Sequence, residues 1–387
     1  MIGVGRNLSN FRRGFPDRLS GLHLKKLRLF QYRNIKELEI VPSEGTTLFV
    51  GRNGQGKTNL LEAMYFLAFG RSFRTSIPRE CIQHNERECC IEGTVVHGSL
   101  SRDLQVRISR TEKKLFLHGK PVTPDTFVGN LHLLAFTQDH LNVVRKSPKD
   151  RRAFLDRAMA TIYPGHVSCL AVYGRALKQR NRILSAAREG KEHLNDSLLD
   201  SWDEALVKQG SRILQNRVHY VDQMKQHLSQ KLFGSEELKM HYVSTVLGKD
   251  NSLSGVEDVF RKRLLQVRGC DQRIGATSVG PHRDDLKLYV NGKSLVDFGS
   301  AGQQRSSLLA LYFSQMEIHR RTHGFYPVFL VDDAEAELDE QRLNTFLKYL
   351  SHRTQTFLTS AKDFMLPVVS RETCRMEVLN GGIIKSV

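Results

Sequence analysis

Eight consecutive residues have the spacing of a phosphate-binding loop, G-x-x-x-x-G-K-[ST]. An apolar run at residues 46–50 precedes them, and a helical pattern follows as far as about Phe69. Glycines let the backbone approach a phosphate because they lack a Cβ atom, and amides at a helix N-terminus favour negative charge. Lys57 supplies a cation for the β- and γ-phosphates, and Thr58 supplies a hydroxyl for Mg²⁺. We therefore expect ATP to bind Gly51, Arg52, Asn53, Gly54, Gln55, Gly56, Lys57 and Thr58.

Two carboxylates follow an apolar strand pattern nearer the C-terminus. Residues 328–331 read Val-Phe-Leu-Val, and Asp332 and Asp333 come next. This is the Walker B pattern, in which a strand brings an aspartate to the Mg²⁺ beside the phosphate loop. We expect Asp332 to bind Mg²⁺ and Asp333 to polarise an attacking water, so that Asp333 and Lys57 are the catalytic candidates. A strand that simply ends in two surface acids is the alternative, and the phosphate loop argues against it.

A third phosphate-binding candidate begins at Ser300, at the start of a predicted helix. Small residues followed by glutamine at a helix N-terminus can hold an anion. The segment resembles the signature motif of ABC-type ATPases, in which it binds the γ-phosphate held by a second subunit. Gly299 and Ala301 depart from the residues that transporters usually have there. The expected contacts are Ser300, Gly302 and Gln303, and the alternative is a serine that only caps the helix.

The composition indicates a polyanionic partner. The 387 residues include 58 Lys and Arg against 41 Asp and Glu, a formal net charge of +17. Such an excess favours nucleic acid, although a protein that is merely basic is the alternative. The six cysteines form no C-x-x-C pair, which predicts reduced thiols. No apolar run approaches the length of a membrane span and no signal peptide is evident, so we expect a cytoplasmic protein.

Hydrophobic periodicity divides the chain into four parts. Residues 1–20 read as a basic extension, 21–146 as strands around the phosphate loop, 147–272 as mainly helical, and 273–387 as a return to strands and helices. The expected strands after residue 272 include a hairpin over 286–298 around Asn291-Gly292. The pattern predicts an α/β unit interrupted by a helical lobe, whose two halves meet in space.

A stripe of basic residues in the helical segment is a candidate surface for DNA. Arg175, Lys178 and Arg182 recur at spacings of three and four, which places them on one helical face. Arg151 and Arg152 are expected to extend the stripe. It can follow phosphates without reading sequence, and no aromatic residues are interleaved for stacking on single-stranded bases. The expected partner is duplex DNA, and the alternative is an ordinary solvated face.

Several segments together resemble the RecF family of bacterial recombination and repair ATPases, which are related to SMC proteins. The resemblance runs from about residue 22 to the C-terminus and is most specific in the Ser-Pro-x-x-Arg-Arg-x-Phe-Leu-Asp and Gly-Pro-His-Arg-Asp-Asp blocks. The segments are 32–35, 51–63, 70–74, 147–156, 280–286, 300–305, 332–333 and 337–339. The implied fold is an ABC-type ATPase head, with a mixed sheet around the phosphate loop and a mainly helical insertion.

The resemblance also implies roles for single residues. Arg33 would lie near the nucleotide. Asp339 would be the D-loop acid that crosses a dimer interface, and Gln138 would be a Q-loop glutamine beside Mg²⁺. Thr359 and Ser360 stand where many ABC ATPases place a switch histidine, which suits slow hydrolysis; His282 is an alternative for that histidine, beside a plain turn residue.

The implied molecule is an ATP- and Mg²⁺-dependent homodimer. It would close on duplex DNA near single/double-strand junctions and act with RecO and RecR to load the recombinase RecA. Two rivals remain: a transporter's nucleotide-binding subunit, and an ATP-dependent nuclease. The basic insertion argues against the first, and the second would need an added metal-binding domain for which the chain has no room.

Overall fold

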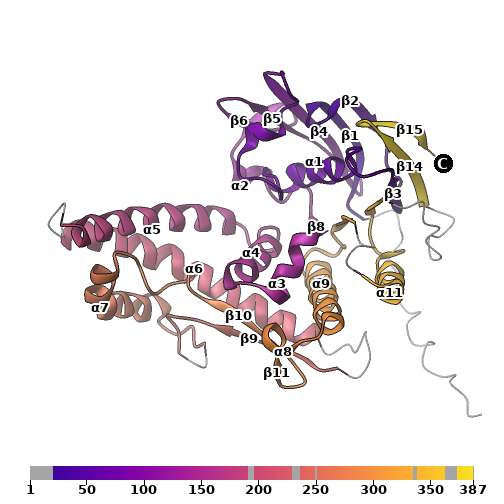
Figure 1. Cartoon of the computed structure of the whole chain (residues 1–387). Coiled ribbons are helices and arrows are strands. Elements are labelled where there is room, and N and C mark those ends of the chain that lie inside the picture. The colour runs from indigo at the N-terminus through magenta and orange to yellow at the C-terminus, as the bar shows by residue number, and fades with distance from the viewer. Residues whose placement is uncertain are drawn as a thin grey trace, which may run out of the picture.

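The computed structural model describes residues 21–190, 196–228, 236–248, 251–333, 338–361 and 373–386. The extension predicted at residues 1–20 lies outside these ranges. Figure 1 shows two lobes, with strands and one long helix in the upper one and a set of long helices in the lower one.

An antiparallel sheet forms the outer layer of the upper lobe. Its order is β2-β1-β4-β5-β6-β7, so neighbours in the sheet are mostly neighbours in the sequence. Along β4, buried residues alternate with less buried ones, because one face packs on the core and the other faces solvent. The strands are β1 (His23–Tyr32), β2 (Ile35–Ile40), β4 (Glu88–His97), β5 (Leu100–Ser109), β6 (Lys113–Leu117) and β7 (Lys120–Val122).

A mixed sheet lies beneath it and joins the two halves of the chain. Its order is β15-β14-β3-β13-β12-β8, with parallel pairing throughout except between β14 and β15. The strands are β3 (Thr46–Val50), β8 (Leu133–Phe136), β12 (Val328–Val331), β13 (Thr356–Ser360), β14 (Thr373–Leu379) and β15 (Gly382–Ser386). The prediction that the two halves meet is therefore confirmed, since β3 lies between two strands that follow it by more than 300 residues.

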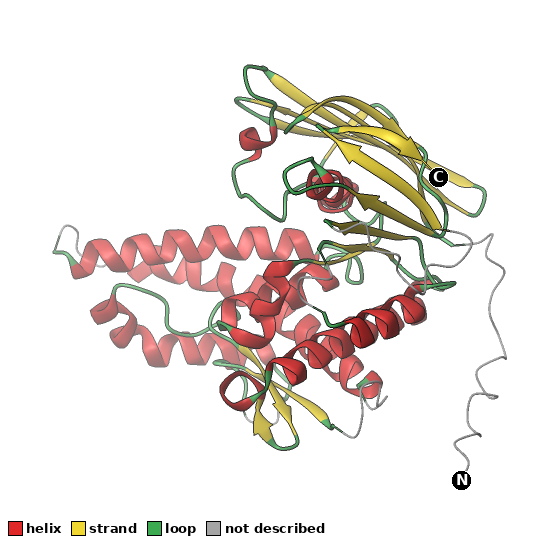
Figure 2. Ribbon diagram, turned by 45° about the vertical axis from the view of Figure 1, so that its right-hand side comes forward, coloured by secondary structure: helices red, strands yellow, loops and turns green. Residues whose placement is uncertain are grey.

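Helix α1 (Lys57–Phe69) lies between these two sheets and is buried nearly all round. Leu60, Met64 and Leu67 are fully buried among apolar side chains of both sheets. Figure 2 shows this helix almost end-on between two layers of strands. A helix that is apolar on every side needs such a double cover, and the arrangement holds its N-terminus rigidly at the edge of the mixed sheet.

The lower lobe is built on long antiparallel helices. They are α4 (Pro148–Met159), α5 (His166–Arg188), α6 (Asp196–His227) and α7 (Val256–Ile274). Leu199, Leu206 and Ile213 of α6 are fully buried, and Trp202 packs against the same core. These four residues recur at helical spacing, which predicts one apolar face, and the structure confirms it.

A three-stranded sheet in the lower lobe was not predicted in this form. Strand β9 (Leu238–Val243) lies within the segment expected to be helical, and it pairs with β10 (Asp285–Val290). The boundary expected at residue 272 therefore falls between two strands of one sheet. The predicted hairpin also ends early: β11 is only Lys293–Ser294, and α8 (Leu295–Phe298) follows as a helical turn. The sheet order is β11-β10-β9.

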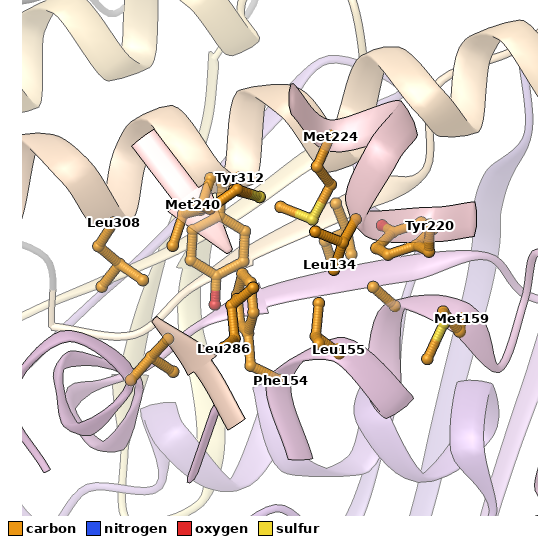
Figure 3. Close-up of a cluster of buried hydrophobic side chains, with 14 of the residues drawn as sticks. Leu134, Phe154, Leu155, Met159, Tyr220, Met224, Met240, Leu286, Leu308 and Tyr312 are labelled. Carbon is orange, nitrogen blue, oxygen red and sulfur yellow. The ribbon is translucent and has the colours of Figure 1, made fainter. Parts of the chain in front are cut away.

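Helix α9 (Ala301–His323) connects the two lobes through a shared core. Tyr312 of α9 contacts Phe154 of α4 with ring centroids 5.5 Å apart, and its hydroxyl donates to the Ala135 carbonyl oxygen of β8 at 2.5 Å. Figure 3 shows Leu134 of β8, Leu155 of α4 and Met224 of α6 in the same cluster. The remaining helices are α2 (Pro124–Phe127), α3 (Asn142–Arg145) and α11 (Glu340–Leu350), with short 3₁₀ turns at Pro78–Cys81 and Gln138–Leu141.

No helix among the described residues combines the length and the apolar character that a membrane crossing requires. The six cysteines are all free, as predicted from their spacing.

Candidate nucleotide-binding site

The predicted phosphate loop connects β3 to α1, as the motif requires. Gly56 has φ of 111°, and a Cβ atom there would lie 2.8 Å from Oδ1 of Asn34. Gly51 has φ of 152°, and a Cβ atom there would lie 2.4 Å from the Val378 carbonyl oxygen. Only glycine fits these two positions, because a side chain would be both strained and in collision. The first turn of α1 carries no acidic residue, so its amides are free of a competing negative charge.

Residues distant in the sequence hold the shape of this loop, and sequence reasoning missed them. The Asn34 side chain donates to the Gln55 carbonyl oxygen at 3.1 Å. The backbone amides of Asn380 and Gly381 donate to the side-chain and main-chain oxygens of Gln55 at 2.7 and 2.8 Å. The turn of the C-terminal hairpin therefore braces the phosphate loop. Its Asn380-Gly381-Gly382 sequence is typical of a turn, but nothing in that pattern indicates what the turn contacts.

Lys57 lies at the mouth of the loop. Its Nζ atom donates to the carbonyl oxygens of Gly51 and Arg52 at 2.7 and 3.0 Å, and the residue is largely buried. A single ammonium group on a flexible stem can exchange such carbonyl partners for phosphate oxygens. Arg52, Asn53 and Gly54 are exposed at the outer side of the loop.

The Walker B strand brings its first acid to the phosphate loop. The Thr58 hydroxyl donates to Oδ1 of Asp332 at 2.9 Å, across 274 residues of sequence. Thr359, at the end of β13, donates to the same oxygen at 2.7 Å and accepts the backbone N–H of Asp333 at 2.9 Å. Because β13 lies between β3 and β12, these three strands deliver their polar ends to one edge of the sheet. Hydroxyl and carboxylate oxygens are the donors that Mg²⁺ prefers, so the residues present fit this ion.

Asp333 has φ of 50°, a left-handed conformation that aspartate tolerates better than most residues. Thr359 is a positioning residue for the pair of acids, and the resemblance had already placed it where many ABC ATPases have a switch histidine. Gln138 follows β8 at the same edge of the sheet, where the Phe136 carbonyl accepts the Asp332 amide at 2.9 Å. The side chain of Gln138 lies outside the described part of the structure, so its role toward Mg²⁺ stays a prediction.

Arg33 has a structural partner in addition to the role that the resemblance implied. Its guanidinium donates to both carboxylate oxygens of Glu62, at 2.7 and 3.0 Å, and to the Glu80 carbonyl oxygen at 2.8 Å. Burial alone would raise the pKa of Glu62, but hydrogen bonds from Arg33 and Ser72 outweigh it and lower that pKa. Glu62 is fully buried in α1, and Arg33 is its nearest cation, at 2.7 Å, with Arg74 farther away at 3.8 Å. The guanidinium thus holds α1 in place, and its nearness to a nucleotide stays a prediction.

The signature segment begins α9 with a complete capping box. Ser300 Oγ accepts the Gln303 amide at 3.2 Å, and the Gln303 side chain accepts the Ser300 amide at 3.0 Å. The Gln303 side chain also donates to Glu236 at 3.0 Å. Gly302 lies beside Arg342, since a Cβ atom there would come within 3.0 Å of the guanidinium. In Figure 1, α8, which leads directly into α9, lies in the lower lobe, whereas β3 and α1 lie in the upper one.

Asp339 is linked to the signature helix through an arginine that sequence reasoning missed. Asp339 caps α11 by accepting the backbone N–H of Arg342 at 2.9 Å. Hydrogen bonds from Arg342, first from its backbone and then from its side chain, lower the pKa of Asp339. The Arg342 Nε atom donates to Ser306 of α9 at 2.9 Å. The D-loop candidate and the signature candidate therefore lie on one continuous surface.

The two most specific blocks of the sequence pack against each other. Arg151 of α4 is 4% exposed and pairs with both carboxylate oxygens of Asp285 at 2.7 and 3.0 Å. Asp156 of α4 pairs with Arg217 of α6 at 2.8 and 2.9 Å, and Arg217 also donates to the Pro281 carbonyl oxygen at 2.6 Å. Burial would raise the pKa of Asp156, but the charge of Arg217 and its hydrogen bonds lower it to about 2.

Two of the predicted DNA contacts are therefore corrected. Arg151 is a buried structural residue and cannot reach a phosphate backbone. Arg152 is partly buried, and its guanidinium donates to the Asp284 carbonyl oxygen at 2.6 Å. Both guanidinium groups donate to oxygens of residues 284–285 and so hold α4 against the start of β10. A buried arginine needs such acceptors close to it. Arg151, Asp156, Arg217 and Asp285 join α4 to β10 and α6 within the lower lobe. We call this set the lobe junction.

His282 also belongs to the lower lobe. Its ring nitrogens contact the Tyr173 hydroxyl at 2.7 Å and the Thr277 carbonyl oxygen at 3.1 Å. Burial lowers the pKa of His282 to about 4. These partners identify a partly buried turn residue, and the carboxylates of the nearby Asp284 and Asp285 bind other groups.

Arg175, Lys178 and Arg182 are exposed on α5, as their spacing predicted. Tyr173 and Ala176 on the opposite side of this helix are buried. We call Arg175, Lys178 and Arg182 the α5 stripe.

Comparison with known proteins supports the same reading as the geometry. Residues 23–385 match the family model described as the RecF/RecN/SMC N terminal domain. A DNA replication and repair protein RecF of Halothermothrix orenii is 32% identical over 370 residues, which cover 94% of this chain and 98% of that protein. The RecF protein of an Exiguobacterium species is 36% identical over 348 residues, covering 88% of this chain and 92% of that protein.

Solved structures give the same result. A structure described as the recombination mediator protein RecF with ATP in the RecFOR pathway matches with a TM-score of 0.86 and 28% identity, covering 95% of this chain and 98% of that one. An Smc head domain from Pyrococcus furiosus matches with a TM-score of 0.55 at 16% identity, which shows a shared fold only. The ABC-type ATPase head predicted from the sequence is confirmed. The chain therefore belongs to the RecF family of DNA replication and repair proteins.

Proposed function

We propose that this chain is an ATP-dependent DNA-binding protein of replication and recombinational repair. The observation that carries the proposal is the contact between Thr58 and Asp332, at 2.9 Å, beside Lys57 and the amides of α1. These groups come from segments 274 residues apart, and together they have the charges and donors for a triphosphate with its Mg²⁺.

In this proposal the residues divide the work between binding and hydrolysis. Residues 51–58 bind the phosphates, with Lys57 at the β- and γ-phosphates. Thr58 and Asp332 hold Mg²⁺, which neutralises charge on the phosphate oxygens. Asp333 positions and polarises a water, while Thr359 keeps both acids in place. Threonine cannot act as the switch histidine does, so hydrolysis is slow.

The nucleotide acts as a ligand of an interface between two copies. Ser300, Gly302 and Gln303 of each copy would contact the γ-phosphate held by the other, and Asp339 would cross beside them. Their position on one exposed surface with Arg342, in a different part of the molecule from the phosphate loop, supports this arrangement. A pair closed by ATP separates after hydrolysis, so slow hydrolysis sets how long the pair lasts.

DNA binds the α5 stripe in this proposal, and duplex next to a single-strand gap is the expected form. Exposed cations without interleaved aromatics contact phosphates and do not stack on bases. Related structures are described as recombination mediators in the RecFOR pathway, so RecO and RecR are the expected partners and recombinase loading the expected outcome. DNA as the partner places the protein in the cytoplasm. Neither a transporter subunit nor a nuclease agrees with the family assignment.

Replacement of Lys57 by alanine tests the proposal. We expect K57A to remain monomeric when ATP and Mg²⁺ are added, in sedimentation velocity, whereas the unchanged protein dimerises. The matched control is Lys120→Ala, an exposed lysine of β7 in the same lobe, which should dimerise normally. Normal pairing of K57A would remove the phosphate loop from the mechanism.

A further inference from the structure

Three histidine rings meet at the end of α9 that is far from the signature segment. One ring nitrogen from each of His132, His319 and His323 lies within 4.8 Å of the other two. The ring centroids form a nearly equilateral triangle, with separations of 4.7, 4.5 and 4.6 Å. His132 and His319 are buried, and His323 is partly exposed. The cluster plays no part in the proposed nucleotide site.

Backbone acceptors fix the orientation of each ring. His319 Nδ1 lies 2.9 Å from the Phe325 carbonyl oxygen, and His323 Nε2 lies 3.0 Å from that of Thr161. A carbonyl oxygen can only accept, so these nitrogens carry the protons. His319 Nε2 and His323 Nδ1 are consequently left with lone pairs. His132 also has a hydrogen bond to the backbone of Gly129.

Two ring nitrogens of the cluster face each other directly. His132 Nδ1 lies 2.6 Å from His319 Nε2. Since His319 Nε2 carries a lone pair, a proton on His132 Nδ1 or a cation must lie between the two atoms to prevent repulsion. A neutral imidazole whose outer N–H donates to a backbone carbonyl is the usual form of a histidine that binds a metal.

We propose that His132, His319 and His323 form a binding site for a divalent transition metal, with Zn²⁺ as the expected ion. Imidazole nitrogen is a good ligand for Zn²⁺, and three histidines leave a fourth position for water. Zn–N bonds of about 2.0–2.1 Å place ligand nitrogens about 3.3 Å apart. His132 and His319 would separate slightly, and His323, in the last turn of α9, would move inward. The proton on His132 Nδ1 would be replaced there by the metal, and its other nitrogen would carry a proton.

Burial favours the neutral rings that such a site needs. Desolvation lowers the pKa of His132 to about 2 and that of His319 to about 3, and it also lowers that of His323. The simpler interpretation is a stacked aromatic cluster, because Phe325 contacts all three rings. Stacking alone does not account for the convergence of three nitrogens with their opposite sides tied to backbone.

The site would join elements that carry the nucleotide machinery. His132 immediately precedes β8, and its carbonyl oxygen accepts the amide of Val328, the first residue of β12, at 2.9 Å. His319 and His323 belong to α9, whose first turn is the signature segment. A bound ion would therefore connect the end of the signature helix to the start of the strand that carries Asp332. This inference does not depend on the proposed function.

The test is a titration of the chelator-treated full chain with Zn²⁺ in excess Mg²⁺, which occupies oxygen sites but not imidazole sites. We expect about one Zn²⁺ per chain by mass spectrometry after gel filtration, and a rise in Tm, because binding to the folded state stabilises it. Co²⁺ in place of Zn²⁺ should give a visible tetrahedral spectrum without a thiolate charge-transfer band, which excludes the cysteines as ligands.

The variants H323A and H319N should bind Zn²⁺ more than about tenfold more weakly and lose the rise in Tm. The control H219A removes an exposed histidine of α6 and should bind as the unchanged protein does. H323A is the decisive variant, because its partly exposed position tolerates alanine. Failure of the unchanged chain to retain Zn²⁺, or equal binding by H323A, would overturn the proposal.

Discussion

The phosphate loop and the lobe junction use charged residues in opposite ways. In the loop, Lys57 donates to two uncharged backbone carbonyls next to the exposed residues 52–54, so its charge can be redirected to a ligand. In the lobe junction, Arg151 and Arg217 each have a carboxylate with paired hydrogen bonds in a buried setting. A buried pair of this kind is satisfied within the chain and has no capacity left for a partner.

This contrast shows that a block of sequence that identifies a family need not contact its ligand. Residues 147–156 and 280–285 carried much of the resemblance, and Arg151 and Arg152 of the first block were expected to contact DNA. Their role is to fasten α4 to β10 and α6. The α5 stripe has a weaker sequence pattern, yet its three cationic side chains are exposed.

The largest expected effect comes from breaking one pair of the lobe junction. D285A leaves the Arg151 guanidinium buried without its carboxylate, which should lower the free energy of unfolding by about 3–5 kcal/mol. Denaturant titration measures this value. The matched control is D222A, which breaks an exposed pair with Lys225 and should cost about 0–1 kcal/mol.

A double replacement sharpens the same comparison. R151M/D285L removes both charges and should recover most of the stability that D285A loses. If D285A were as stable as D222A, the distinction between the buried junction and ordinary surface pairs would be wrong.

The next effect concerns the surface that ATP is proposed to bring to a second copy. S300R places a bulky cation at the first turn of α9 and should weaken ATP-dependent dimerisation by more than about tenfold, or about 1.4 kcal/mol. Nucleotide affinity of the monomer, measured by calorimetry, should be unchanged, because the phosphate loop lies elsewhere. S300A is the control: it removes only the capping oxygen and should cost about 1 kcal/mol of helix stability. Equal loss of pairing in S300A would attribute the effect to the cap.

The smallest effect is expected at the α5 stripe. R175E/K178E should weaken duplex binding about three- to tenfold and flatten the dependence of log K on log salt by about 1–2 units. Fluorescence anisotropy at several salt concentrations measures both. The control K208E/R212E makes the same change in net charge on exposed residues of α6. An equal effect of the two pairs would mean that net charge, and not the stripe, controls binding.

Local patterns predicted the parts of the fold whose determinants lie close together. The strand, loop and helix around Lys57, the strand before Asp332, and the capping of α9 by Ser300 all follow from residue types at fixed spacing. The C-terminal hairpin and the apolar face of α6 follow in the same way. Strand β9 was missed because it lies between long helices and pairs with a strand more than 40 residues later. The strand expected over 293–298 was mostly wrong, because a helical turn leads into α9 there.

Long-range pairing decided the rest. Arg33 neutralises Glu62, a pairing that the sequence did not indicate, and Arg151 was expected on DNA and instead neutralises Asp285. A sequence gives the charged residues but not which of them become buried. A buried charge pairs with an opposite charge that the fold brings next to it.

The sequence by itself determined the chemistry available to this protein: a phosphate loop, a pair of acids after an apolar strand, and an excess of cations. Only the tertiary structure decided which of those groups are free to act. Sheet pairing brought Thr58, Asp332 and Thr359 to one edge, because parallel strands deliver their carboxyl ends together. The packing of α4 on β10 withdrew Arg151 from the surface, since desolvating a guanidinium is tolerated only where a carboxylate meets it.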